Sequence, residues 1–211
     1  MPDDADRDEL LASAVVAHVG MSVDGIPVVI PLLFQHEDGV FYFHGARASR
    51  AIRHLASGAP VCVTVSALDG FVASRSAFSH SVNYRSVVAL GRGTPVDDPA
   101  TKRAVLERMT ARMLGGRAVG RDYLPATEKQ LRATGMAAIT VDDWSGKRRT
   151  GPPLGEFDGD LPPDHPAASM WAGLISVGGD GNQPGVLAVW GVLAGESIRD
   201  GDACPWARAA S

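Results

Sequence analysis

The chain has 211 residues, 45% of them hydrophobic, which is enough for the core of one domain with appendages. Its formal net charge of -4 argues against nucleic-acid binding, which usually shows as a basic domain or stripe. The two cysteines, Cys62 and Cys204, indicate neither a disulfide framework nor a zinc site. The N-terminus lacks the apolar core of a signal peptide and no apolar run is long enough to span a bilayer, so we expect a cytoplasmic protein without membrane contact.

The first part of the chain predicts a short helix and three strands. The helix covers residues 6–14, with Asp6 as its N-cap. Three strands follow, separated by Asp24-Gly25 and by Asp38-Gly39. Both dipeptides are flanked by apolar residues, which is typical of two-residue hairpin turns.

The next segment predicts a second helix and a strand. Residues 48–57 form the helix, and its buried side would consist of Ala51, Ile52, Leu55 and Ala56. In residues 61–68 apolar and polar side chains alternate, as in a half-buried strand. Asp69-Gly70 then predicts a third hairpin turn.

The second half predicts more strands, two helices and a long loop. The strands cover residues 71–77, 83–96 and 136–146, and the helices cover 98–114 and 126–134. On the first of these helices the buried face would hold Val105, Leu106, Met109 and Met113. Residues 147–165 are rich in Pro, Gly and Asp and predict a loop, followed by apolar segments at 171–177 and 185–198. Closely spaced strands with hairpin turns and a few helices indicate a mainly β fold, an antiparallel barrel with peripheral helices.

Three arginines and a serine, Arg47, Ser49, Arg50 and Arg53, mark the start of the predicted second helix. Backbone N–H groups at a helix start, a hydroxyl donor and arginines that grip two oxygens at once would together hold a phosphate. Basic helix faces are also common as plain solvated surfaces. The residues alone leave both interpretations open.

A second polar cluster comprises His80, Asn83, Tyr84, Arg85 and Ser86, at the start of a strand that then turns apolar. Such a pattern is compatible with a site at the end of a sheet. It is equally compatible with a salt bridge from Arg85 and ordinary packing of Tyr84.

Several common sites are missing from the sequence. The six histidines show no H-x-x-H or H-E-x-x-H spacing, so we expect no metal site, and none stands out as an axial haem ligand. There is no G-x-S-x-G, no Walker A loop and no G-x-G-x-x-G that opens a helix after a strand.

The order of five motifs nevertheless resembles one known family. The motifs are "VAHVGMSVDGIPVVIPLLFQHEDGVFYFHGARASRAIRHL", "PVCVTVSALDG", "NYRSVVALGRGTPVDDPATKRAVLERM", "KRRTGPP" and "MWAGLISV". Together they are similar to the pyridoxamine-phosphate-oxidase-like flavoproteins, in particular the flavin-nucleotide-binding branch that includes nitroimidazole-resistance proteins. The resemblance implies a six-stranded FMN-binding split barrel over residues 1–178, with residues 179–211 as a C-terminal extension. It also implies a homodimer with two sites at the subunit interface.

The resemblance also implies a set of cofactor-binding residues. Ser49 and Arg50 would bind the flavin phosphate; Arg47 or Arg53 would support them, because Ala51 replaces a lysine common in the oxidases. The remaining implied cofactor-binding residues are Val29, Ile30, Pro31 and Leu32 along the ring, and His44, Thr64, Tyr84, Arg85, Ser86, Lys147 and Trp171. His44 and Tyr84 are candidate proton donors.

The function that this resemblance implies is an FMN-dependent oxidoreductase that acts on a small molecule. In such proteins the cofactor performs the redox chemistry, and the protein binds and orients it. The alternatives are a flavin, haem or deazaflavin carrier without turnover, and a barrel that has lost its cofactor. The substrate-phosphate arginine and histidine of the oxidases have no match here, so we do not predict pyridoxamine phosphate oxidation.

Overall fold

The computed structural model describes residues 4–177. Within this range the chain forms two compact units. The first unit consists of residues 4–66 and 86–147, and the second of residues 67–85 and 148–177. The predicted apolar segment at 185–198 and the predicted C-terminal extension lie outside the described residues.

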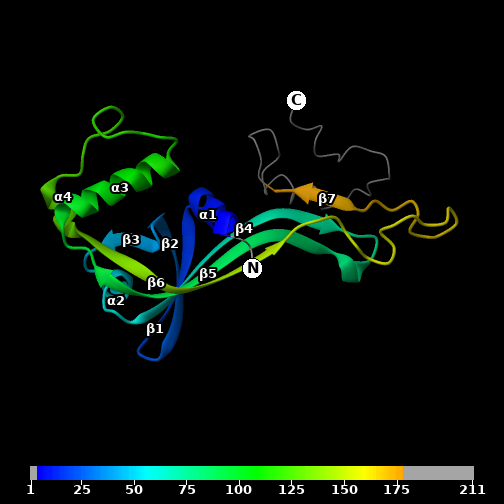
Figure 1. Ribbon diagram of the computed structural model, residues 1–211, viewed down its shortest axis with the longest axis horizontal. Helices are drawn as coiled ribbons and strands as arrows, with labels where there is room; N and C mark the ends of the chain where they lie inside the picture. The colour runs from blue at the N-terminus through cyan, green and yellow to red at the C-terminus, as the bar shows by residue number, and fades with distance from the viewer. Residues whose placement is uncertain (1–3, 178–211) are drawn as a thin grey trace. The chain divides into compact units, whose positions relative to one another are not determined.

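The barrel is a ring of six strands (Figure 1). The strands are β1 Val16–Val23, β2 Ile26–Glu37, β3 Val40–Ala46, β4 Pro60–Ala73, β5 Ser81–Pro95 and β6 Thr134–Arg149. They are arranged in the order β1-β2-β3-β6-β5-β4, and β4 pairs again with β1 to close the ring. In the second unit a short strand, β7 Gly173–Ser176, pairs antiparallel with β4. The predicted mainly β split barrel is therefore confirmed.

Two of the predicted hairpin turns are present as expected. Asp24 and Gly25 have φ values of 54° and 79°, and Asp38 and Gly39 have values of 49° and 77°. Left-handed backbone at both central residues is the mark of a type I′ turn, whose twist matches that of the flanking strands. The register Val23↔Ile26 follows directly from the first turn.

The third predicted turn, at Asp69-Gly70, is wrong. β4 runs through this dipeptide to Ala73, and Gly70 pairs with Ser176 of β7. A Cβ at Gly70 would lie 3.0 Å from the Ile175 carbonyl oxygen, so the close approach of β7 is what favours glycine here. The chain turns later, through the short 3₁₀ helix Ala77–Ser79.

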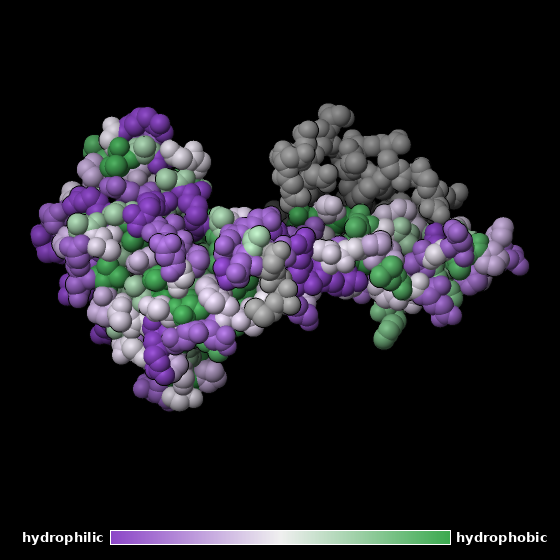
Figure 2. All heavy atoms as spheres, in the orientation of Figure 1, coloured by the Kyte–Doolittle hydropathy of each residue, from purple (hydrophilic) through white to green (hydrophobic). Residues whose placement is uncertain are grey.

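Four α-helices accompany the strands: α1 Asp4–Ser13, α2 Arg50–Leu55, α3 Pro99–Met113 and α4 Glu128–Ala133. In α1 Asp6 lies in the first turn and is not the N-cap, because the helix already begins at Asp4. Hydrophilic residues cover α1 in Figure 2, while its Leu10 and Leu11 are buried. No helix among residues 4–177 is long and apolar enough to cross a membrane.

The caps of α3 and α4 explain where these helices begin. Asp98 precedes α3, and its carboxylate accepts hydrogen bonds from the backbone N–H of Thr101 at 2.8 Å and from its hydroxyl at 2.6 Å. These bonds lower the pKa of Asp98. Thr127 and Gln130 form a reciprocal capping box at the start of α4. Both predicted helices are thus confirmed.

The barrel core combines aromatic and aliphatic side chains. The rings of Phe34, Phe41 and Phe43 are fully buried. In β4 the side chains of Val61, Val63 and Val65 are buried and alternate with more exposed neighbours, as predicted. On α2 the buried residues are Ile52 and Leu55, whereas the predicted Ala51 and Ala56 are half-buried.

Two glycines of β5 allow other segments to approach its backbone. A Cβ at Gly91 would lie 2.2 Å from the Thr140 carbonyl oxygen of β6. A Cβ at Gly93 would lie 1.9 Å from the Leu55 carbonyl oxygen and 2.4 Å from Cδ1 of Ile139. Gly93 is therefore the point where the end of α2 rests directly on the barrel.

A buried and a half-buried cation hold α3 in place. Lys102 is 4% exposed, and its ammonium donates to the Thr134 carbonyl at 2.9 Å. Arg112 donates to the carbonyl oxygens of Phe34 and Ala14 and to Oε1 of Gln35. The sequence pattern predicted Val105 and Met109 on the buried face, which is correct, but it missed Lys102.

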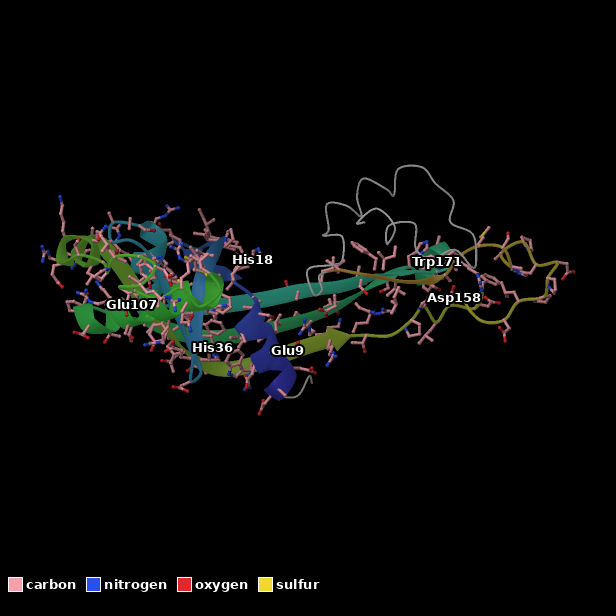
Figure 3. The ribbon with its side chains drawn as sticks, turned by 90° about the horizontal axis from the view of Figure 1, so that it is seen from above. Glu9, His18, His36, Glu107, Asp158 and Trp171 are labelled. Atoms are coloured by element: carbon pink, nitrogen blue, oxygen red, sulfur yellow. The ribbon has the colours of Figure 1, made fainter. Side chains whose placement is uncertain are left out.

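In the second unit a carboxylate organises the predicted loop. Asp158, labelled in Figure 3, accepts from Ser74 Oγ at 2.7 Å and from the backbone N–H groups of Arg75 and Gly155 at 2.8 Å each. The Arg75 guanidinium in turn donates to the Met170 carbonyl at 2.6 Å. The loop begins later than predicted because β6 continues to Arg149.

Candidate functional site

The barrel is split where β2 leaves β3. Pairing between these strands ends at Phe34↔Phe43, whereas β2 continues to pair with β1 as far as Ile26↔Val23. Residues 26–33 of β2 therefore have only one neighbouring strand in the described structure. We call their other side the open β2 edge.

The open β2 edge offers a defined set of backbone groups. The Phe34 N–H donates to the Val15 carbonyl, on the side of β1. Since backbone groups alternate along a strand, the odd-numbered residues 27–33 direct theirs toward the open edge. Pro27 and Pro31 have no N–H, so the donors on this edge are the N–H groups of Val29 and Leu33. Such groups are free to bind an edge of a flat polar ring.

The arginine cluster follows the end of β3. The backbone is fixed there, because the Arg47 N–H donates to the Ala133 carbonyl at 2.9 Å and the Ser49 N–H donates to the Ala46 carbonyl at 2.8 Å. Arg47, Arg50 and Arg53 are exposed. Their guanidinium groups form no ion pair or hydrogen bond with any residue in the described part of the chain. The Ser49 hydroxyl does not cap α2. Three positive charges and a hydroxyl are thus available to an anion.

Two of the predicted cofactor-binding residues, Pro31 and Thr64, lie in one row on the outer face of the barrel. His18 of β1 pairs with Pro31 of β2 on one side and with Thr64 of β4 on the other. Directly opposed residues share a face of a sheet, so Pro31, His18 and Thr64 lie side by side. Val29 lies in the adjacent row, across from Gly20.

Ile30 and Leu32, which were also predicted to lie along the flavin ring, point the opposite way. Ile30 pairs with Val19 and Leu32 pairs with Ala17, and both partners are fully buried. Ile30 and Leu32 therefore face the barrel interior with their side chains. A ligand outside the barrel can meet only their backbone.

A hollow of about 430 Å³ adjoins the outer row. Gly20 and Gly91, which have no side chains, both line it. The other lining residues are Met21, Ser22, Pro27, Pro60, Val61, Cys62, Leu90, Arg92 and Asp142. The hollow is mostly apolar, with Arg92 and Asp142 as its charged residues.

His44 lies on a different part of the barrel. It alternates with the buried Phe43 and pairs with Met136, which is 2% exposed. Tyr42 shares this face, and its phenol acts electrostatically on Arg108 of α3. His44 Nδ1 is buried without a hydrogen-bond partner in the described structure, and burial lowers the pKa of the ring. The predicted role of His44 at the cofactor stays a prediction.

A second buried histidine, His36, lies beside Phe41 and Trp144, with ring centroids 4.8 and 5.7 Å away. Burial is also the main reason why its pKa is lowered. In the unfolded chain both histidines regain the ordinary value of about 6.5.

We expect these two histidines to make the protein less stable in mild acid. Below about pH 6.5 the unfolded chain binds protons that folded His36 and His44 do not, so stability falls as the pH falls. Thermal unfolding midpoints from about pH 7.5 to pH 5 should decline, and the decline should be shallower in a His44→Gln variant. An identical slope in that variant would contradict the assignment of His44.

The remaining predicted residues divide between the two units. Ser86 and Lys147 meet in the first unit, where the Ser86 hydroxyl donates to the Lys147 carbonyl at 3.5 Å. Tyr84, Arg85 and Trp171 belong to the second unit. Trp171, labelled in Figure 3, lies so close to Gly173 that a Cβ there would be 2.5 Å from its ring.

Arg85 forms the salt bridge that was one of its two interpretations. Its guanidinium binds both carboxylate oxygens of Asp69 at 2.9 to 3.2 Å, and both side chains are largely shielded from solvent. The resulting pair joins β4 and β5 within the second unit. Its predicted contact with a cofactor stays a prediction.

The sequence matches a family model, that of pyridoxamine 5'-phosphate oxidase, over residues 3–148. The chain belongs to this family. The matched residues contain all six barrel strands except the last residue of β6. No curated protein sequence matches the chain significantly.

Solved structures of the family share this fold. The flavocytochrome Anf3 from Azotobacter vinelandii is 34% identical, with a TM-score of 0.71 over 85% of this chain and 80% of that chain. A FAD- and heme-binding protein from Mycobacterium smegmatis is 29% identical, with a TM-score of 0.71 over 100% of this chain and 96% of that chain. A protein assigned to 5-nitroimidazole antibiotic resistance, from Bacteroides thetaiotaomicron, is 20% identical over 69% of this chain and 84% of that chain, with a TM-score of 0.55, and shows the fold alone.

Sequence reasoning missed His18. In β1, His18 and Gly20 alternate with the buried residues Ala17, Val19 and Met21. This alternation is visible in the sequence. The neighbours of His18 on β2 and β4 cannot be read from the sequence, because His18 and its partner on β4 are more than forty residues apart.

Proposed function

We propose that the protein binds a flavin at the open β2 edge and uses it in redox chemistry on a small molecule. The observation that carries this proposal is the edge itself, where backbone donors are left unpaired in the described structure, together with an arginine cluster that follows β3, the strand from which β2 separates. Membership of the family and the flavin-binding relatives support it.

The residues present fit such a cofactor. The N–H groups of Val29 and Leu33 are suited to the polar edge of an isoalloxazine ring, which carries carbonyl and ring-nitrogen acceptors. Ser49, Arg50 and Arg47 would hold phosphate through charge-assisted hydrogen bonds. The bound flavin would supply transfer of a hydride or single electrons, and the protein would orient it and limit access of water.

The flavin can be FMN or FAD, which differ in the number of phosphates. The sequence predicts FMN, whereas the relative that spans the whole chain is named for FAD. Three arginines exceed what a single phosphate requires and suit the diphosphate of FAD. We therefore favour FAD. Mass spectrometry of the cofactor released by heat would show which flavin is bound.

A flavin or electron carrier without substrate turnover is the second candidate. One predicted proton donor favours it, because a ring nitrogen of His44 is buried and has no partner in the described structure. Anaerobic reduction of the bound flavin by NADH or NADPH, followed by addition of electron acceptors, separates the two candidates. Reduction with multiple turnovers supports the enzyme, and a flavin that neither nicotinamide reduces supports the carrier.

Substitution Arg50→Ala tests the phosphate site. A charge-assisted hydrogen bond contributes about 1.5–3 kcal/mol, so we expect flavin to bind about 10- to 150-fold more weakly. Quenching of flavin fluorescence on titration measures this affinity. Arg132→Ala, which removes an exposed arginine of α4, is the matched control and should leave the affinity unchanged. Equal affinity of Arg50→Ala and the wild type would remove Ser49 and Arg50 from the site.

We also propose that the protein is a homodimer, as the resemblance implies. Large apolar side chains are exposed on the first unit, among them Ile26 at 64% and Leu90 at 48%. Single apolar residues are normal on a surface, but a cluster favours association. Light scattering after size exclusion should give twice the mass of the chain. A mass of 22.1 kDa would contradict the proposal.

A further inference from the structure

Another hollow is formed by α3, α4 and the loop of residues 114–127 that joins them (Figure 1). We call it the α3–α4 pocket. Its volume of about 430 Å³ lies in the range of small-molecule sites. All of its lining residues belong to the first unit, and none of them is predicted or proposed to bind the flavin. The pocket is therefore a separate candidate site.

The walls of the α3–α4 pocket are held by internal hydrogen bonds. The Arg103 guanidinium donates to the Ala126 carbonyl at 3.0 Å and so ties the loop to α3. Within the loop the Asp122 carboxylate accepts from the Ala118 N–H at 2.8 Å, and the capping box of α4 fixes the end of the loop. A pocket that is formed in advance loses little conformational entropy when a ligand binds.

One part of the α3–α4 pocket is apolar and open to solvent. Leu106 belongs to the predicted buried face of α3, yet it is only half-buried and lines the pocket. Across from α3, the loop contributes Leu124, which is 88% exposed, and Pro125. An apolar ligand would remove this surface from water, which is favourable.

The pocket also contains a carboxylate without a partner. Glu107 of α3, labelled in Figure 3, is half-buried and forms no hydrogen bond or ion pair with any of residues 4–177. Arg103 lies four residues earlier on the same helix face, a spacing at which ion pairs are common. Its guanidinium instead lies 2.6 Å from Oε1 of Glu128. Glu128 thus neutralises Arg103, and the charge of Glu107 remains uncompensated.

The neighbouring hydroxyl can only accept a hydrogen bond. Thr110 Oγ1 donates to the Leu106 carbonyl at 2.8 Å, so only its lone pairs remain for a ligand. The Tyr123 hydroxyl is buried and therefore out of reach of a ligand. No three metal-ligating side chains come together anywhere in residues 4–177, so a metal ion would lack the oxygen ligands that it needs. A carboxylate and a hydroxyl oxygen beside an apolar wall suit an organic cation with N–H donors.

We infer that the α3–α4 pocket binds a small organic amine. The ammonium group pairs with Glu107, and the apolar body of the molecule packs against Leu106 and Leu124. Attraction between the ammonium and a half-buried carboxylate is stronger than between the same charges in water. A neutral molecule of the same shape would make the apolar contacts but not the charge-assisted hydrogen bond, and an anion would be repelled.

Calorimetric titration of the full-length protein with 2-phenylethylamine tests this inference. We expect saturable binding of the amine, binding of the uncharged 2-phenylethanol that is weaker by about tenfold or more, and no binding of phenylacetate. Glu107→Gln should weaken binding of the amine by about tenfold or more, because it removes the charge and keeps the shape. Glu9→Gln makes the same change on the exposed surface of α1 and is the matched control, with unchanged affinity.

Nuclear magnetic resonance adds the location, because amide shifts should change in α3 and in residues 123–127. Absence of amine binding, or equal affinity of Glu107→Gln and the wild type, overturns the inference. Equal affinity for the amine and the alcohol overturns the role of the charge, and shift changes confined to other residues overturn the location. Glu107 has no partner in residues 4–177, so its variant should fold, which circular dichroism verifies. The flavin proposal is judged separately by the Arg50→Ala titration.

Discussion

Gly93→Ala should destabilise the protein by at least about 3 kcal/mol, the upper range for overpacking a core. The added Cβ would lie 1.9 Å from the Leu55 carbonyl oxygen and 2.4 Å from Cδ1 of Ile139. The Ile139 side chain can rotate away, but the Leu55 oxygen belongs to the last turn of α2. The Gly58 N–H also donates to the Gly93 carbonyl at 3.0 Å, so the two segments cannot separate without losing this bond.

Urea denaturation of wild type and variant measures this change as a shift of the midpoint at constant slope. Gly159→Ala is the matched control, because nothing lies within 4 Å of a Cβ at that position. It should change stability by less than about 0.5 kcal/mol. Equal effects of the two substitutions would mean that α2 does not rest on β5 as described.

The second large effect is expected for Arg112→Met, which keeps the length and apolar stem of the side chain. Its guanidinium lies 5.0 Å from the Phe34 ring centre and is half-buried, and this burial lowers the pKa of Arg112. Met cannot donate to the Phe34, Ala14 and Ala12 carbonyls that Arg112 binds. Leaving a buried acceptor unpaired costs about 1–3 kcal/mol, and because the Phe34 and Ala14 carbonyl contacts are part-buried, we expect a total loss of about 3 kcal/mol.

Thermal unfolding followed by circular dichroism would show this loss as a lower midpoint. Arg132→Met removes an exposed arginine of α4 and should have little effect. Hydrogen exchange adds a local test, because the variant should lose protection in α1 and at the start of β1, which Arg112 joins to β2. A stable variant with unchanged exchange would show that water replaces the guanidinium without cost.

Local features of the fold were predictable because short-range chemistry determines them. Asp24-Gly25 and Asp38-Gly39 form the expected turns, since few residues tolerate two left-handed backbone conformations in succession. Asp98 and Pro99 begin α3 because a carboxylate caps free N–H groups and Pro lacks one.

Features that depend on distant segments were not predictable. Asp69-Gly70 has the same composition as the true turns, but β7 pairs alongside it and keeps the strand extended. Ring closure by β1 and β4 has no local signal either. The burial of Lys102 depends on a carbonyl, that of Thr134, supplied by another element.

The candidate site likewise combines features that were predictable from the sequence with features that were not. Pro31 and Thr64 were predicted as cofactor-binding residues from the resemblance to a family, and the structure places both beside His18. Alternation along β3 turns His44 away from the fully buried Phe43 and onto the face of Met136, but the sequence does not show what covers that face. Which residues meet across strands is decided by register, and register is a property of the folded sheet.

The gap between β2 and β3 has a consequence for association with other chains. An unpaired strand edge is ordinarily a template on which a foreign strand can add and start aggregation. Here two prolines, Pro27 and Pro31, remove every second donor that an incoming strand would need. The barrel can therefore keep eight residues of edge open to a small molecule and still resist growth into a larger sheet.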